Sequence, residues 1–287
     1  MIRPASFCAN YALKTSQGAI NRGEEQSKSM LTHGPHAGSL EDMWAVAIEI
    51  AHRDGGDPGH LALAGPKSLP PPQRPMRLAV METEGLAQMD TASVSAFEAV
   101  LLQLKNAGIE IMHRDDDQWL EGFEQTLVGV SKLNLEITAW ENQWALRNVL
   151  LSSADPDALT AFGKATIETA ERLGLDGYER SLKERAVVLA SFAAVEKRFD
   201  AFISPSSKGT ASRIDAGASL KPGQGFPTGD PVFNTPASLL GACELTSPLT
   251  SVGGLPMGIQ LMGCNGADAR ITAIANWMRG AIAPVCS

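Results

Sequence analysis

The segment from RLAVM (77–81) through DTASVSAFEAVLLQLKNAG (90–108) to IEIM (109–112) decides the fold class of this chain. Its two outer parts are short apolar runs, which is typical of buried strands. The middle part repeats apolar residues at helical spacing on one face: Val94, Phe97, Leu101 and Leu104. A strand, a crossover helix of this length and a second strand form a right-handed parallel unit. We therefore predict an α/β fold.

Further helices and strands are expected on both sides of this unit. The segment SLEDMWAVAIEIAHRDGGDP (39–58) predicts a helix, since Ser39 can cap its start, Asp42 has the capping-box spacing and Gly55 can stop it. The preceding residues 1–38 are punctuated by Gly and Ser and predict short strands and turns. A proline-rich connector follows at 64–77, within what we expect to be a single domain over 1–287.

The second half of the chain begins with helices and returns to strands. Residues 135–200 have a helical pattern, which runs into the buried strand DAFISP (200–205). A loop rich in Gly and Pro covers 206–231. The segment LPMGIQLMG (255–263) predicts another strand, and DARITAIANWMRG (268–280) predicts a closing amphipathic helix.

The composition restricts the kind of protein. The chain has 287 residues, 44% of them hydrophobic, and a net charge of −8, which disfavours a nucleic-acid partner because such a partner requires a basic face. The four cysteines are widely spaced, and the first thirty residues contain no apolar signal segment. The longest apolar run, 186–195, is too short to span a membrane. We therefore expect a cytoplasmic protein without a membrane partner.

The standard catalytic motifs are absent, and three weak candidates remain. His33 and His36, with His52, Asp54, Asp57 and His60 downstream, could ligate a metal, although a polar loop followed by a helix end is the simpler interpretation. Asp115–Asp117 could attract a cation, but a charge run after a strand is more often a solvated turn. Ser206, Ser207 and Lys208 place hydroxyls beside an amine, yet sequence neighbours rarely share one reactive face. We predict no metal site and no cofactor.

Two parts of the chain resemble one enzyme family. The first part comprises IRPASFCANYALKTSQGAINR (2–22) and HAGSLEDMWAVAIEIAHRDGGDP (36–58). The second comprises DAFISPSSKGTA (200–211), GDPVFNTPASLLGACELTSPL (229–249) and GGLPMGIQLMG (253–263). Together, in this order and spacing, they resemble the amidase signature family, whose members hydrolyse amide and sometimes ester bonds. The resemblance covers about 1–66 and 135–282, and it implies a mixed β-sheet flanked by helices on both faces.

The resemblance also implies where the chemistry would lie. In that family a Lys acts as a base through a Ser on a cis peptide and activates a second Ser, and a glycine-rich turn binds the oxyanion. Aligned on Ile2-Arg3-Pro4, the nucleophile would stand immediately before Met1, and the Lys and the other Ser would lie further upstream. We therefore expect no catalytic residue in this chain. It would be the C-terminal part of an amidase, with the N-terminal part missing and no activity of its own.

The substrate-binding candidates follow from the same resemblance: Arg3, Asp230, Asn234 and Thr235. Arg3 would lie nearest to the nucleophile, although an arginine at such a turn also ties backbone carbonyls. The other three border the family's substrate pocket, and loop capping is the simpler interpretation of them. The expected ligand is a small amide or ester. A non-catalytic amide-binding or scaffold protein, the A-type subunit of a glutamine-dependent amidotransferase and a homo-oligomer all stay open.

Overall fold

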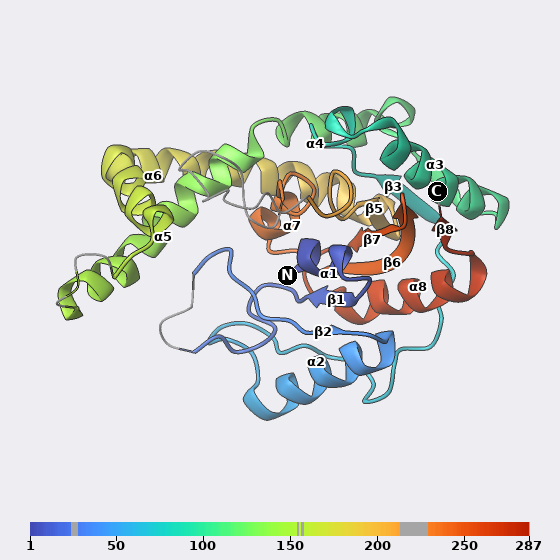
Figure 1. Ribbon diagram of the computed structural model, residues 1–287, viewed down its shortest axis with the longest axis horizontal. Helices are drawn as coiled ribbons and strands as arrows, with labels where there is room; N and C mark the ends of the chain where they lie inside the picture. Colours follow the sequence, from blue (N-terminus) through green and yellow to red (C-terminus); the bar gives the residue numbers. More distant parts are fainter. Residues whose placement is uncertain (24–27, 154, 156–157, 213–228, 287) are drawn as a thin grey trace.

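The computed structural model describes residues 1–23, 28–153, 155, 158–212 and 229–286. Its strands form one mixed sheet in the order β2-β1-β6-β7-β5-β3-β4, and β8 pairs with β6 (Figure 1). The strands are β1 (Tyr11–Lys14), β2 (His36–Ala37), β3 (Arg77–Val80), β4 (Glu110–Met112), β5 (Ala201–Pro205), β6 (Glu244–Val252), β7 (Leu255–Met262) and β8 (Val285–Cys286).

The segment that decides the fold class forms the expected parallel unit. Strand β3 leads into helix α3 (Thr91–Asn106) and then into β4, which lies parallel to β3. Helix α3 begins where Asp90 Oδ1 accepts a hydrogen bond from the Ser93 amide at 2.9 Å. Strand β5 adds to the other side of β3, also parallel, and β7, β6, β1 and β2 continue antiparallel. The predicted mixed sheet is confirmed.

One face of the sheet is covered by α2 (Leu40–Asp54), α3 and α8 (Asp268–Ala281). These helices bury apolar side chains against strand residues such as Leu78, Ile203 and Leu261. The start of α2 is as predicted, since Ser39 Oγ accepts a hydrogen bond from the Asp42 amide. Its end is as predicted too: Gly55 has a φ of 72°, which other residues adopt only with strain.

The opposite face is covered by four helices from the second half of the chain and by the short α1 (Ile2–Phe7). The four are α4 (Gln118–Thr126), α5 (Val130–Ser152), α6 (Ala161–Val195) and α7 (Thr235–Leu240). Because strand side chains alternate between faces, Ala79, Phe202 and Met262 point into this second layer. Phe123 and Phe192 pack on Phe202 at ring-centroid distances of 5.7 and 5.6 Å. The two-sided helical cover is confirmed.

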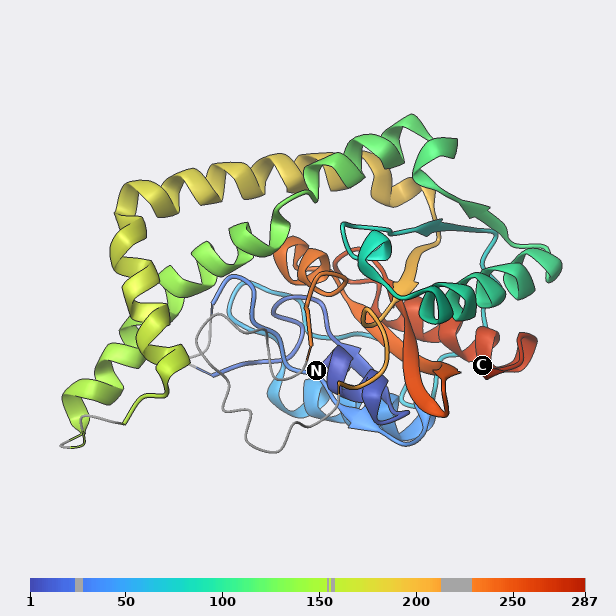
Figure 2. The ribbon, with the colours of Figure 1, turned by 45° about the horizontal axis from the view of Figure 1, so that its top comes forward.

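Helices α5 and α6 extend together well beyond the sheet as an arm (Figures 1 and 2). The two helices pack on each other along their length, and α6 contains a non-helical residue, Gly174, with a φ of 62°. The arm approaches the loops that follow β1, because Ser29 bonds to Glu141 of α5. Among the described residues, no helix combines the length and apolar character needed to cross a membrane.

The prediction of only short strands and turns before residue 39 was wrong at the start of the chain. Ile2–Phe7 forms a helix, in which Pro4 sits in the first turn, where its missing amide hydrogen costs nothing. Helix α1 is held against the sheet by Ile2 and Ala5, which pack on Ala12 of β1. The connector contains no helix or strand before β3 and is fixed by contacts such as Trp44 Nε1 to Pro66 O at 2.9 Å.

Candidate functional site

Polar side chains replace apolar ones on the helix α1 side of the second sheet face. One row across the sheet runs from Lys14 on β1 through Glu244 on β6 to Met262 on β7. The next row carries Thr246 on β6, Gln260 on β7 and Ser204 on β5, directly opposite one another. Lys14, Glu244, Thr246, Gln260 and Ser204 are all buried. We call these five residues the polar sheet face.

Helix α1 lies close to this face because Gly258 of β7 has no side chain. A Cβ at Gly258 would lie 2.4 Å from Thr246 Oγ1 and 3.1 Å from the Cβ of Ser6. The Gly258 amide instead donates to Ser6 Oγ at 2.7 Å, and Ser6 Oγ lies 3.2 Å from Ser207 Oγ. The glycine therefore brings the start of the chain onto the sheet.

Arg3 and Asn234 lie together, although they are 231 positions apart in the sequence. Arg3 Nη1 donates to Asn234 Oδ1 at 2.9 Å, and Asn234 Nδ2 donates to Gln260 Oε1 at 2.7 Å. Gln260 Nε2 in turn donates to Ser204 Oγ at 2.9 Å and to the Phe233 carbonyl at 2.8 Å. A continuous hydrogen-bonded chain thus connects α1, the segment before α7 and the polar sheet face, and it fixes the direction of the Arg3 guanidinium.

Glu244 is the least satisfied member of the polar sheet face. Its exposed fraction is 0%, and neither carboxyl oxygen has a hydrogen-bond partner within the described part of the chain. Its cross-strand neighbour Lys14 donates instead to the carbonyls of Ala242 (2.7 Å) and Ala237 (3.3 Å). Burial raises the pKa of Glu244 to about 8, although the nearby Lys14 acts in the opposite direction. Burial likewise lowers the pKa of Lys14, against the effect of Glu244.

The other two predicted binding residues hold the loop before α7. Asp230 Oδ1 accepts from the Val232 amide at 3.0 Å, and Asp230 Oδ2 pairs with Lys208 Nζ at 2.6 Å. Thr235 Oγ1 donates to the Pro231 carbonyl at 2.9 Å. These side chains cap the turn that presents Asn234, so the structure brings Arg3 and Asn234 together and gives Asp230 and Thr235 supporting contacts.

The Ser206, Ser207 and Lys208 candidate separates in space. Ser206 Oγ lies 2.6 Å from Thr246 Oγ1, and Ser207 Oγ donates to the Gly209 carbonyl at 2.7 Å. Lys208 Nζ reaches Gln88 Oε1 at 2.9 Å and the Asp230 carboxylate. The lysine is therefore directed at other groups than its neighbouring hydroxyls, as expected for a lysine of a loop.

The residues named as weak metal candidates also have other partners. Asp57 is buried and pairs with Arg22, and Asp117 accepts from the Trp119 and Leu120 amides at the start of α4. Asp116 Oδ2 accepts from the His113 amide at 2.9 Å. Over the described residues, no three His, Cys, Asp or Glu side chains gather closely enough to hold one metal ion.

Glu244, Lys14 and the serine hydroxyls near α1 were missed by the sequence analysis. The available signal was a break in strand patterning: in β6 and β7, polar residues occupy alternate positions, at Glu244 and Thr246 and at Gln260. Alternation of this kind usually indicates a solvated face. Here α1 covers the face, so the same pattern marks a buried polar network.

Comparisons with known proteins agree with the residues that carry the site. The Amidase family matches this chain over residues 2–272. Among curated proteins, the A-type subunit of the Clostridium kluyveri glutamyl-tRNA(Gln) amidotransferase is 26% identical over 91% of this chain and 56% of its own length. The corresponding protein of Koribacter versatilis is 25% identical over 99% of this chain and 62% of its own length. The chain thus spans about 60% of these relatives.

Solved structures show the same fold. A bacterial aryl acylamidase of the amidase signature enzymes has a TM-score of 0.77 at 16% identity, covering 97% of this chain and 59% of that one. A crystal structure of an amidase has a TM-score of 0.76 at 18% identity, over 98% of this chain and 60% of the other. With the match over residues 2–272, the agreement in fold and the motifs that place Arg3 beside Asn234, the chain belongs to the amidase signature family.

Proposed function

We propose that this chain forms the acyl-binding wall of an enzyme that hydrolyses the C–N bond of a small amide, or the C–O bond of an ester. The observation that carries the proposal is the hydrogen bond between Arg3 and Asn234, which joins the two segments that resemble the family. A carbonyl substrate has an oxygen that needs donors, and a guanidinium offers several in a fixed plane. Arg3, held by Asn234, would meet that oxygen or fix the turn beside it.

Asp230 and Thr235 have a supporting role in this proposal. Asp230 lies close enough to Arg3 for its charge to act against the lowering of the Arg3 pKa by burial. Thr235 holds the turn at Pro231 from which Asn234 projects. We propose that both residues position Asn234 and Arg3 without touching the substrate.

The reacting groups are proposed to lie N-terminal to Met1. In the family the Ser nucleophile, the second Ser and the Lys base precede the segment matched by Ile2–Phe7. The two lysines near the site have other partners: Lys14 Nζ donates to backbone carbonyls, and Lys208 pairs with Asp230. Residues 1–287 would then form a pocket wall, in a cytoplasmic protein that uses neither metal nor cofactor.

Hydrolysis of an aryl amide tests the proposal. The release of p-nitroaniline from p-nitroacetanilide is measured for residues 1–287 and for the same chain extended by the in-frame residues encoded upstream. Only the extended chain is expected to turn over the amide, and Arg3→Met in it should lower kcat/KM about tenfold or more. Arg53→Met on the exposed side of α2 is the matched control. Full turnover by the extended Arg3→Met variant would contradict the role of Arg3.

A second candidate is the A-type component of a tRNA-dependent amidotransferase. The specific observation is that the curated relatives from Clostridium kluyveri and Koribacter versatilis both carry that name. The same pocket wall would then serve a complex with other subunits. Co-purification of a stoichiometric partner with the tagged chain favours this candidate, and a chain that purifies without a partner and still hydrolyses p-nitroacetanilide when extended favours the free amidase.

A third candidate is an amide-binding or scaffold protein without catalysis. It becomes the better account if the upstream DNA encodes no segment ending in Gly-Gly-Ser and a simple amide such as acetamide still raises the melting temperature. Loss of that shift in Asn234→Leu would locate the binding at the Arg3–Asn234 pair.

A further inference from the structure

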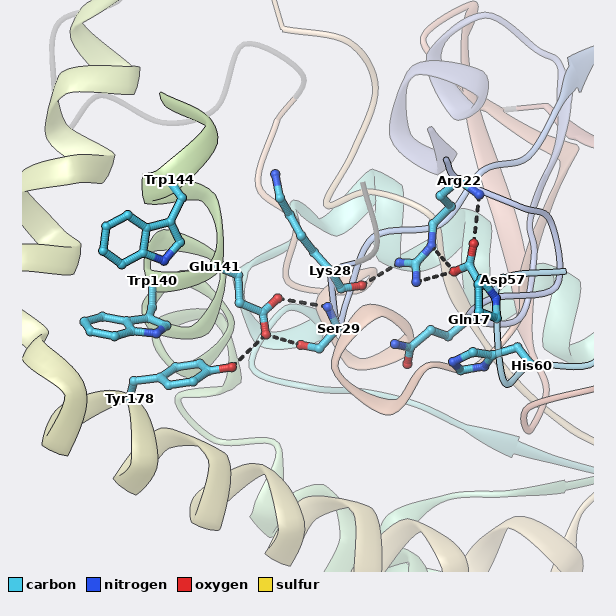
Figure 3. A pocket seen from close by; sticks show the side chains of 11 residues that line it. Gln17, Arg22, Lys28, Ser29, Asp57, His60, Trp140, Glu141, Trp144 and Tyr178 are labelled. Carbon is cyan, nitrogen blue, oxygen red and sulfur yellow. Dashed lines mark hydrogen bonds and ion pairs between the residues drawn. The ribbon is translucent and has the colours of Figure 1, made fainter. Parts of the chain in front are cut away.

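A cavity of about 720 Å³ separates the arm from the loops that follow β1 (Figure 3). One wall consists of Trp140 and Trp144 of α5 and Tyr178 of α6, and the other includes Arg22 and Asp57. We call it the arm cavity. Its volume is within the usual range of small-molecule sites, about 300–1,000 Å³. The predicted binding residues Arg3, Asp230, Asn234 and Thr235 do not line it.

The aromatic wall is built to receive a flat ring. Trp140 stacks on Tyr178 with ring centroids 5.4 Å apart and an interplanar angle of 18°. Trp144 lies one helical turn further along α5 and remains 60% exposed. Figure 3 shows the three rings grouped on one side of the cavity. A half-buried stack beside an exposed indole provides a ready face for a further aromatic ring.

The walls are fixed by hydrogen bonds before any ligand arrives. Glu141 Oε1 accepts from Ser29 Oγ and, at 3.1 Å, from the Tyr178 hydroxyl, and Glu141 Oε2 accepts from the Ser29 amide at 2.9 Å. These contacts tie the loop to both helices of the arm. On the far wall Asp57 accepts from Arg22, whose side chain also donates to the carbonyls of Lys28 and Leu31. A site fixed in this way loses little entropy on binding.

The charges around the arm cavity leave one positive charge over. Arg22 and Asp57 form a pair whose side chains are each 3% exposed, so they neutralise each other. Glu141 lies close enough to Arg185 to act on its pKa, and Arg185 Nη2 reaches the Ser29 carbonyl on the same side. The Lys28 ammonium then remains, with one acceptor given by the described residues, Asn142 Oδ1 at 2.5 Å. An ammonium carries three donors, so Lys28 can bind an additional acceptor.

We propose that the arm cavity binds a planar aromatic carboxylate, with its ring on the Trp144 face and its carboxylate on the Lys28 ammonium. Lys28 extends between the aromatic wall and the Arg22 wall in Figure 3, and Asn142, its partner, lies on α5 two residues before Trp144. Ring and charge are therefore recognised by neighbouring positions. This site is separate from the pocket wall around Arg3.

Fluorine NMR with p-fluorobenzoate and its uncharged analogue p-fluorobenzamide tests the proposal on the full chain. Line broadening by the protein gives the affinity of each probe. Lys28→Met should weaken p-fluorobenzoate about tenfold and leave p-fluorobenzamide nearly unchanged, because it removes the charge and keeps the side-chain length. Trp144→Leu should weaken both probes about tenfold, because both use the ring.

A matched tryptophan and the other site provide the controls. Trp119 is also exposed and has the Arg198 guanidinium 5.9 Å from its ring centroid, as Trp144 has Arg147 at 6.0 Å, but Trp119 does not line the cavity. Trp119→Leu and Asn234→Leu should leave both probes bound as before. The proposal is wrong if wild type broadens neither probe, if Lys28→Met and Trp144→Leu change nothing, or if Asn234→Leu removes the binding.

Discussion

The polar sheet face and the arm cavity solve opposite problems. The first concentrates buried polar groups, including Glu244 with an exposed fraction of 0%, under a helix that leaves no room for a side chain at Gly258. The second has open space and exposed aromatic surface, and its charges are mostly paired. The polar sheet face carries the residues that define the family, while the arm cavity is built by the helices between them. Family membership therefore does not identify every site that a chain can use.

The largest expected effect breaks the wall of the arm cavity. Asp57→Ala removes the partner of the buried Arg22 guanidinium, whose side chain is 3% exposed, and should lower the free energy of unfolding by about 3 kcal/mol. Urea denaturation of both proteins measures the difference. The control is Glu49→Ala, which breaks an exposed pair with Arg53 and should change stability little. Equal effects of the two substitutions would show that the Arg22–Asp57 pair does not hold the wall.

The next effect breaks the polar sheet face. Gln260→Leu keeps the approximate volume but removes the partners of Asn234 Nδ2, Ser204 Oγ and the Phe233 carbonyl. Because buried polar groups left without partners are costly, we expect a loss of about 2–3 kcal/mol in urea denaturation. Gln125→Leu, which breaks only the exposed contact with Glu121 on α4, serves as the control. A Gln260→Leu variant as stable as wild type would mean that this network contributes no stability.

A pH-dependent effect sharpens the comparison at Glu244. Its pKa is raised by burial to about 8, so the folded chain holds a proton that the unfolded chain releases, and stability falls as pH rises from about 4.5 to about 8. Glu244→Gln removes this fall. Relative to wild type, the variant should therefore be similar near pH 5 and more stable by a few kcal/mol near pH 9. Lys14, whose pKa burial lowers, contributes the opposite slope at higher pH.

Urea denaturation across this pH range measures the difference, and Glu98→Gln on the exposed side of α3 is the control. If wild type and Glu244→Gln keep a constant difference in stability from pH 5 to pH 9, Glu244 does not titrate as proposed.

The smallest effect concerns the aromatic wall. Tyr178→Phe removes the hydroxyl that donates to Glu141 Oε1 at 3.1 Å and keeps the ring stacked on Trp140. We expect a loss of about 1 kcal/mol in the free energy of unfolding. Affinity for p-fluorobenzoate should stay within about twofold of wild type, since the ring surface remains. A much larger loss of affinity would mean that the Tyr178 hydroxyl itself contacts the ligand.

Much of the fold could be predicted from local pattern. The parallel unit from β3 to β4 and the helix beginning at Ser39 depend on periodicity and capping, which act within a few residues. Helix α1 could not be predicted in this way, because a six-residue helix is stabilised by packing on Ala12 and Gly258 and has little stability of its own.

The site could be predicted only in part. Arg3 and Asn234 were found through motifs, and their contact depends on a turn that sequence does not show. Glu244 was missed because a lone carboxylate in a strand gives no sign that a helix will cover it. The arm cavity was missed because its residues come from three distant segments, and tryptophans of a long helix, such as Trp140 and Trp144, usually pack in a core.

Labelling of residues 1–287 with a fluorophosphonate, followed by intact-mass measurement, tests the central proposal most directly. The proposal is that this chain supplies the wall of an amidase site without the reacting hydroxyl. It predicts an unmodified mass, since Ser6 accepts from Gly258 and lies against Ser207 with no lysine donating to either hydroxyl in the described contacts. A single adduct on Ser6, Ser206 or Ser207, accompanied by amide turnover, would contradict it.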